Sequence, residues 1–334
     1  MATWRVRALL TTYPELAAVL VAAIVGLSVQ RPLAWLAARQ GISVLLAVLV
    51  FATAVTIEPA ALRRAALAWR PLLATLIAGV TVLPALSWAA SRLVPAGSLR
   101  DGVLAAGLAP CEIASVATTA MAGGEAAVAA GALIGSTVAA VALAGPILSL
   151  ESGRAGFSPG GIVVNLALVV ALPLATGITL RATAPAAART LAARRDARAT
   201  DSAAAVAIWT ERADRVASRT AIVAVAALVA LIAAEVRLSA GYASVAGALV
   251  VFLLASALIG WLLGRRAPRP VAAAVLLTTS MRDFAIAAAL AAAAFGPPAA
   301  APLGLYGILV LIWGTATAAT LRRRAVAVPP PVLL

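Results

Sequence analysis

Histidine and lysine are absent from this 334-residue chain, and cysteine occurs once. Without histidine, the sequence lacks the common proton shuttle, the usual metal ligand and the base of serine–histidine hydrolases. A single cysteine excludes a disulfide bond within the chain. The sequence also contains no phosphate-binding loop, dinucleotide-binding glycine pattern or zinc motif. These absences predict that the protein is not an enzyme and holds no resident metal or organic cofactor.

Charged residues are also scarce, at 11% of the chain, whereas 63% of the residues are hydrophobic. Soluble domains of ordinary composition are far more polar. Apolar runs long enough to cross about 30 Å of hydrocarbon recur from end to end. We therefore expect a single membrane domain over residues 1–334, surrounded by lipid. The net charge of +14 does not indicate nucleic acid, because the arginines lie between the apolar runs.

Ten apolar segments can be placed along the chain, in two groups of five. Their expected boundaries are 14–29, 41–57, 70–94, 99–122 and 125–150, followed by 157–180, 219–238, 241–264, 271–295 and 302–321. Five spans per group reverse the orientation of the second group, which is the pattern of an inverted repeat. The sequence thus predicts an all-α fold of ten transmembrane helices with repeats over residues 12–150 and 157–322.

A polar stretch over residues 182–218 lies inside the second repeat and mixes arginines and acids among alanines. We expect it to be a cytoplasmic, partly helical linker at the headgroup surface. A solvated run of charges is the alternative interpretation.

Arginine is the only basic residue, so its distribution tests the orientation of the spans. Both termini of a ten-span protein lie on one side, and we count 19 arginines on that side against 6 on the other, with Arg282 alone inside a span. Positively charged loops face the cytoplasm. We therefore expect a multi-pass protein of a bacterial plasma (inner) membrane with both termini in the cytoplasm.

Two polar interruptions, at 110–115 and 278–283, fall in the fourth segment of each group. They carry Glu112, Arg282 and Asp283, and a charge at the centre of a bilayer costs at least about 2.5 kcal/mol. Such groups persist where they face a protein interior or a wet cavity. In inverted-repeat transporters, paired broken helices meet at the binding site. We therefore predict that these three residues mark a substrate or ion site.

The interruptions and the residues just after the first one also carry hydroxyl groups that could coordinate a cation or satisfy backbone carbonyls at the breaks. A sodium ion would lie near Ser115 and Thr278. For Arg282, one interpretation is an ion pair with Glu112 or Asp283, and another is a bidentate contact to an anionic substrate. The hydroxyl candidates are Ser115, Thr118, Thr119, Thr278, Thr279 and Ser280.

The run over residues 107–125 resembles the fourth-helix signature of the bile acid:sodium symporter family, and residues 278–296 resemble its ninth helix. Gly41-Ile42-Ser43 and Pro84 also fit this pattern. The resemblance implies a ten-helix transporter in which spans 1, 2, 6 and 7 form a panel domain. Spans 3–5 and 8–10 would form a core domain containing two crossing broken helices. Substrate would bind between the domains, and rocking would alternate access to it.

The resemblance also implies a set of sodium ligands, of which only Ser115 is retained. The other family positions are occupied here by Thr278, Arg282, Val116 and Gly79. Arg282 would thus place a fixed cation about where a sodium ion lies in relatives, which argues against the usual coupling to two sodium ions.

Cys111 points to another branch of the same superfamily, the arsenite efflux permeases, which are similar in carrying a cysteine at this point of the fourth helix. A thiolate is a soft ligand suited to metalloids. A lone cysteine in an apolar helix also serves simply as a small core residue.

We therefore expect a secondary active transporter of a small organic anion or related solute. Its coupling ion would be sodium or, if Glu112 or Asp283 titrates, a proton. One alternative is an arsenite or antimonite efflux permease with a metalloid substrate. Another is a membrane sensor or scaffold that has lost transport. The partners we expect are a small solute and the lipid bilayer, without nucleic acid, and the oligomeric state stays open.

Overall fold

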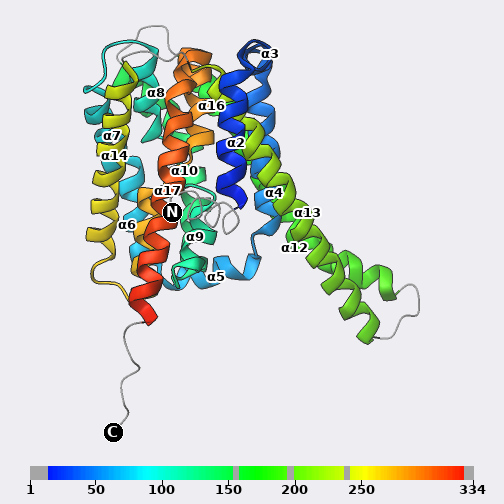
Figure 1. Ribbon diagram of the computed structural model, residues 1–334. Coiled ribbons are helices and arrows are strands. Elements are labelled where there is room, and N and C mark those ends of the chain that lie inside the picture. Colours follow the sequence, from blue (N-terminus) through cyan, green and yellow to red (C-terminus); the bar gives the residue numbers. More distant parts are fainter. Residues whose placement is uncertain (1–13, 153–157, 194–198, 237–240, 327–334) are drawn as a thin grey trace, which may run out of the picture. The chain divides into compact units, whose positions relative to one another are not determined.

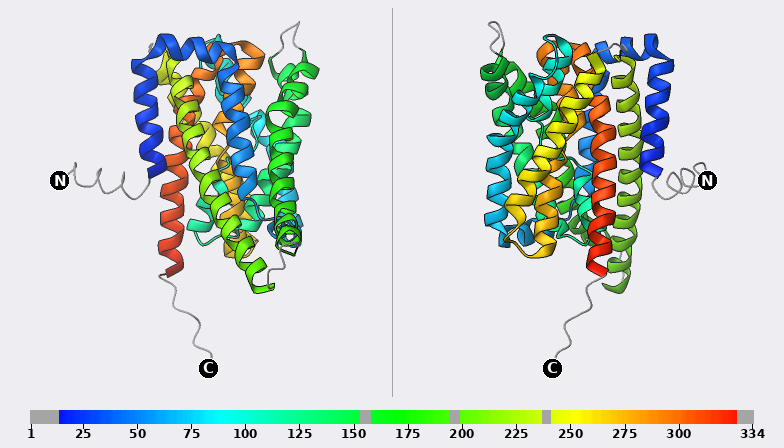
Figure 2. Two further views of the ribbon diagram at one scale, coloured as in Figure 1. Left: turned by 90° about the vertical axis from the view of Figure 1, so that its right-hand side faces the viewer. Right: turned by 60° about the vertical axis from the view of Figure 1, so that its left-hand side comes forward.

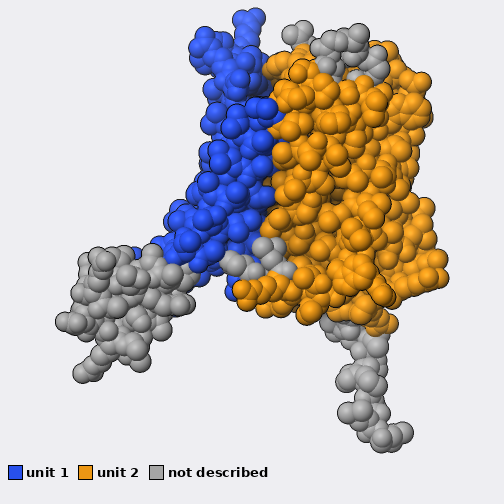
Figure 3. All heavy atoms as spheres, turned by 180° about the vertical axis from the view of Figure 1, so that it is seen from behind, with its two compact units in different colours: residues 1–60, 164–234 blue, residues 61–163, 235–334 orange. Residues whose placement is uncertain are grey.

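The computed structural model describes residues 14–152, 158–193, 199–236 and 241–326, and these ranges contain helices and one isolated β-bridge but no strand (Figure 1). The chain divides into two compact units, shown in separate colours in Figure 3. Unit 1 comprises residues 1–60 and 164–234, and unit 2 comprises residues 61–163 and 235–334. Unit 1 thus holds most residues of the segments that the resemblance assigns to a panel domain, and unit 2 holds the segments of the core domain.

Unit 1 is built from apolar helices that approach one another closely at small residues. Both α2 and α4 pack against α13, and α12 packs against α4. At Gly26 of α2, a β-carbon would lie 2.3 Å from the Ala230 carbonyl of α13, so only glycine permits this approach. The elements are α2 (Pro14–Ser28), α3 (Gln30–Leu36), η1 (Ala37–Gly41), α4 (Ile42–Thr56), the end of α11 (Pro159–Leu166), η2 (Ala167–Ala171), α12 (Leu172–Ala193) and α13 (Ala199–Ala234).

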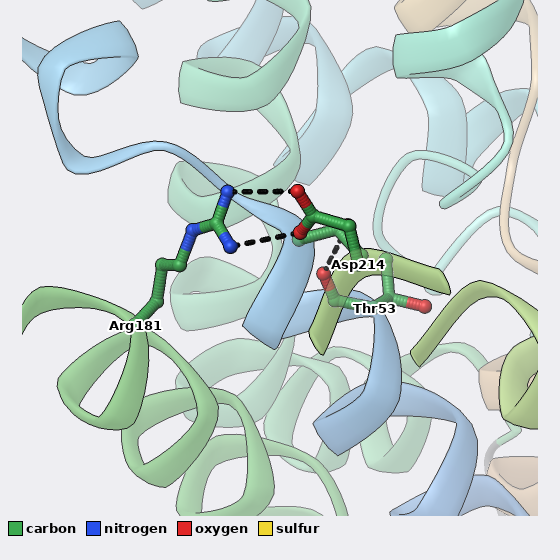
Figure 4. Close-up of polar contacts among 4 residues, drawn as sticks. Thr53, Arg181 and Asp214 are labelled. Atoms are coloured by element: carbon green, nitrogen blue, oxygen red, sulfur yellow. Dashed lines mark hydrogen bonds and ion pairs between the residues drawn. The ribbon is translucent and has the colours of Figure 1, made fainter. Parts of the chain in front are cut away.

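Within the stretch over residues 182–218, the structure describes helix over 182–193 and 199–218. Helix α12 runs on to Ala193 and α13 begins at Ala199, because alanine and arginine strongly favour helix. The position of this stretch at the headgroup surface stays a prediction. Arg181 and Asp214 join the two helices through an ion pair of 2.8 Å, with Thr53 of α4 nearby (Figure 4).

Several predictions of the arginine count fall outside the described residues. They concern both chain ends and Arg5, Arg7, Arg154, Arg194, Arg195, Arg198 and Arg237. The placement of the termini therefore stays a prediction.

Unit 2 contains the two interrupted segments. Within it α8 packs against α16, whereas α9 packs against α15 and α10. Figures 1 and 2 show α14 and α17 running along these helices. The elements are α5 (Pro59–Leu67), α6 (Trp69–Val80), α7 (Val82–Ser91), α8 (Ser98–Ala106), α9 (Ser115–Met121), α10 (Ala126–Ser152), α14 (Gly241–Gly264), α15 (Arg269–Ser280), α16 (Phe284–Phe295), η3 (Pro297–Ala300) and α17 (Ala301–Val326).

By length and composition, 7 helical stretches in the described ranges can cross a membrane. The protein is therefore a multi-pass membrane protein. The predicted segments near 14–29, 99–122 and 271–295 are not among the seven, because α2 has 15 described residues and the other two segments are interrupted. The ten-helix count and the inverted repeat remain predictions. The stretches are Gln30–Thr56, Trp69–Ser91, Ala126–Glu151, Pro159–Ala184, Ala207–Ala234, Gly241–Gly264 and Pro297–Arg324.

Candidate functional site

The two interruptions cross each other in antiparallel direction inside unit 2. Cys111 and Arg282 form an isolated antiparallel β-bridge at the crossing. The Glu112 amide donates to the Met281 carbonyl at 2.8 Å, and the Asp283 amide donates to the Pro110 carbonyl at 2.9 Å. Unwound backbone in a membrane is stable only where its polar groups find partners. Each break therefore supplies hydrogen-bond partners for the other.

Helix ends of opposite polarity meet near this crossing. The carboxyl end of α8 leads into the first break, and the amino end of α16 follows the second, while α8 and α16 pack against each other. Figure 1 shows these two helices at the same end of unit 2 and α9 toward the other end. A helix carries partial negative charge at its carboxyl end and partial positive charge at its amino end. The crossing thus offers one place that favours a cation and one that favours anions.

Two carboxylates occupy the amino end of α16. The Oδ1 atom of Asp283 accepts hydrogen bonds from the Ala285 amide at 2.9 Å and the Ile286 amide at 2.8 Å. The Oε2 atom of Glu112 accepts from the Phe284 amide at 3.3 Å. Glu112 and Asp283 are 6% and 0% exposed. Both predicted acids therefore cap the same helix, one from its own chain segment and one from across the crossing.

Arg282 turns to the opposite helix end. Its guanidinium donates to the carbonyl of Ala109, just beyond α8. A β-carbon added at Gly79 of α6 would lie 3.6 and 3.7 Å from the two terminal nitrogens of Arg282, so the guanidinium rests against this glycine. Arg282 is 3% exposed.

The hypothesis that Arg282 forms an ion pair with Glu112 or Asp283 is wrong for the structure, since no such pair exists among the described residues. Instead, the cation lies at the negative end of α8 and the carboxylates lie at the positive end of α16. Helix polarity accounts for this separation.

The six predicted hydroxyl groups fall into two sets. Three donate to carbonyls of their own helices: Thr118 to Ala114 at 2.7 Å, Thr278 to Ala274 at 2.7 Å and Ser280 to Leu276 at 2.8 Å. Ser280 also accepts from the Trp313 indole at 3.0 Å. In the described part of the chain, the buried hydroxyls of the other three have no hydrogen-bond partner; they belong to Ser115, Thr119 and Thr279.

Cys111 is held by a residue of another helix, α10. The Cys111 amide donates to the Ser136 hydroxyl of α10 at 3.0 Å, and that hydroxyl donates to the Cys111 sulfur at 3.3 Å. The thiol of Cys111 forms no disulfide bond, and the residue is 1% exposed. This environment is that of a small, packed core residue.

Sequence reasoning missed Tyr306 of α17. The residue is fully buried, and its hydroxyl has no partner in the part of the chain that the structure describes. The only available signal was a single tyrosine inside an apolar run. Gly79 was named from the sequence only as the residue at a position where the family has a sodium ligand, and its contact with Arg282 was not predicted.

Residues 43–242 match the sequence pattern of the sodium bile acid symporter family. The chain belongs to this family. Its members are transporters and not enzymes, so at this coarse level the protein is not an enzyme. The match includes the first break but ends before the second, whose part in the site rests on the geometry above. None of the curated proteins matches the chain.

Proposed function

We propose that this family member is a secondary active transporter that carries a small organic anion or related solute across a bacterial plasma membrane. In this proposal its ten helices form two inverted repeats, and the solute is exposed to each side in turn by alternating access. Both chain termini face the cytoplasm, as the arginine distribution predicts.

The observation that carries the proposal is the crossing of the two broken segments through the bridge between Cys111 and Arg282. Unwound backbone and buried charge are costly in a membrane and occur together where a solute or ion must bind. The two segments carry three buried ionisable residues. They also carry three hydroxyl groups that have no hydrogen-bond partner in the described ranges. They support a binding site in which Glu112, Arg282, Asp283 and the hydroxyl residues contact solute or ion.

The coupling ion in this proposal is sodium or a proton. The family's name favours sodium, whereas two carboxylates at one helix end offer a place for a proton. Uptake that proceeds without sodium but follows the pH gradient would assign the proton. Full sodium dependence that survives Glu112→Gln and Asp283→Asn would exclude these carboxylates from coupling.

Thermal stabilisation of the purified protein provides the first test, screened over sodium, pH and small organic anions. A ligand that binds the folded state raises the melting temperature by an amount that grows with the logarithm of its concentration relative to Kd. The stabilising anion is then loaded outside proteoliposomes, and its uptake is compared with that of protein-free vesicles. Stabilisation without any uptake would favour the sensor or scaffold interpretation and contradict transport.

Arsenite or antimonite efflux is a second candidate, because Cys111 lies directly in the bridge of the crossing. Expression in a metalloid-sensitive host tests it. Protection that is lost on Cys111→Ser would support a thiolate ligand. Absence of protection, or protection that survives Cys111→Ser, would exclude a metalloid role for this thiol.

A further inference from the structure

Arg282 lies where a helix end would otherwise attract a dissolved cation. The last carbonyl groups of a helix lack intrahelical partners and carry partial negative charge. In transporters with broken helices, these carboxyl ends and the unwound carbonyls after them coordinate the coupling cation. Here the Ala109 carbonyl, which follows α8, accepts its hydrogen bond from the guanidinium of Arg282. A covalently attached cation is therefore already in place.

Space for this cation comes from a glycine on a different helix. Gly79 of α6 is buried, and its absent side chain leaves the two terminal nitrogens of Arg282 at 3.6 and 3.7 Å from where a β-carbon would be. A methyl group at residue 79 would fit against the guanidinium, but a longer side chain would need the volume that the guanidinium occupies. The glycine therefore determines whether the arginine can reach the carboxyl end of α8.

Nothing else in the described surroundings neutralises Arg282 by direct pairing. Its two acidic neighbours at the crossing, Glu112 and Asp283, bind the amides of α16 and form no ion pair with it. Without an ion pair, the carbonyl and the helix end that a buried cation contacts help to stabilise it. This contact is therefore what Arg282 contributes to the crossing.

We propose that Arg282 is a built-in cation that replaces a dissolved coupling cation at the carboxyl end of α8, and that Gly79 makes room for it. The inference rests on the proposed transport function only where it says that Arg282 replaces a coupling cation. The occupancy of the helix end by Arg282 is independent of transport. At this place the protein needs no sodium, in contrast to what the family's name suggests.

The test measures melting temperatures of the purified full-length protein in sodium chloride, choline chloride and low-millimolar guanidinium chloride. Wild type is expected to melt at the same temperature in sodium and choline. Arg282→Met removes the cation and leaves the Ala109 carbonyl unpaired, so its melting temperature falls by at least about 5 °C. Sodium or guanidinium, but not choline, then restores part of the loss. Arg181→Met removes an arginine of unit 1 and should leave the melting temperature insensitive to the choice of cation.

A second pair of variants keeps the proposal testable if Arg282→Met does not fold. Gly79→Gln fills the space beside the guanidinium without removing the charge, whereas a β-carbon at Gly247 of α14 meets no atom within 4 Å. Gly79→Gln should lower the melting temperature, and Gly247→Gln should not. Equal melting temperatures for these two variants would overturn the proposal. Sodium stabilisation of wild type as large as that of Arg282→Met would also overturn it.

Failure of the transport proposal would give a different result. No solute uptake, combined with the cation responses described above, would remove the transporter interpretation and leave the built-in cation supported. Sodium-driven uptake by wild type, combined with sodium stabilisation of wild type, would support transport and remove the built-in cation.

Discussion

At the scale of single residues, the crossing is organised by which helix end each charge contacts. Asp283 and Glu112 bind the first amides of α16, and Arg282 binds the carbonyl beyond α8. These contacts let buried charges persist without ion pairs to one another, because helix ends supply partial charges of opposite sign. The same residues are therefore expected to affect stability as well as any binding function.

Asp283 allows its capping role to be separated from its charge. Asp283→Ala removes the acceptor for the amides of Ala285 and Ile286, and we expect a loss of about 1–2 kcal/mol in unfolding free energy. Asp283→Asn keeps a capping oxygen and should lose less. Denaturation of the purified protein measures both. Equal losses for the two variants would contradict the capping role.

Ser136 is expected to hold the first break in position. Ser136→Ala leaves the buried Cys111 amide without its acceptor, which should cost about 1–3 kcal/mol. Ser149 lies on the same helix, but its hydroxyl bonds only its own helix in an exposed position. Ser149→Ala should therefore change stability by less than about 0.5 kcal/mol. A Ser136→Ala variant as stable as this control would show that the contact does not support the break.

At the scale of helices, glycines of α17 place that helix against the crossing. A β-carbon at Gly307 would lie 2.8 Å from the ring of Phe284, which begins α16. At Gly314 the nearest atom is the terminal methyl group of Met281, at 2.6 Å. A packed ring cannot move aside as readily as a flexible methionine end.

Gly307→Ala is thus expected to reduce the unfolding free energy by about 1–3 kcal/mol through overpacking. Gly314→Ala should reduce it less, because Met281 can adopt another rotamer. Thermal denaturation of the two variants side by side makes the comparison. A larger loss for Gly314→Ala would mean that Phe284, and not Met281, is the adaptable neighbour.

In unit 1, the bidentate contact of Arg181 with Asp214 joins α12 to α13. The Asp214 side chain is 39% exposed, so solvent weakens the interaction. A double-mutant cycle with Arg181→Met and Asp214→Asn should give a coupling of about 0.5–1 kcal/mol that falls with added salt. Zero coupling at low salt would contradict a stabilising role for this pair.

At the scale of the whole molecule, apolar patterning was enough to predict a multi-pass helical protein and both interruptions. Charge within apolar runs marked the breaks at 110–115 and 278–283, and a proline also marked the first of them. The end of α14 at Gly264 was also predicted, because glycine and arginine follow its apolar run. The length of α12 and α13 was not, because alanine favours helix whether or not lipid surrounds it.

The partners within the site were beyond prediction from one sequence. Which carbonyl Arg282 contacts depends on the register between two segments that are far apart in the chain. The contact with Gly79 depends on a third helix. One of the two interpretations from the sequence paired Arg282 with an acid because opposite charges attract, but the helix ends attract these groups as well.

Solute uptake by variants at the crossing tests the central claim most directly. Proteoliposomes containing wild type, Glu112→Gln, Asp283→Asn or Arg215→Met are compared with the anion that stabilises the purified protein. Arg215 pairs with Glu211 on an exposed face of α13, away from both breaks in sequence. Arg215→Met is therefore the control variant that removes one charge outside the crossing. We predict that Arg215→Met retains uptake and that both crossing variants lose at least about tenfold, roughly 1.4 kcal/mol of lost stabilisation. Uptake by Glu112→Gln and Asp283→Asn at the wild-type rate would contradict the assignment of the crossing as the transport site.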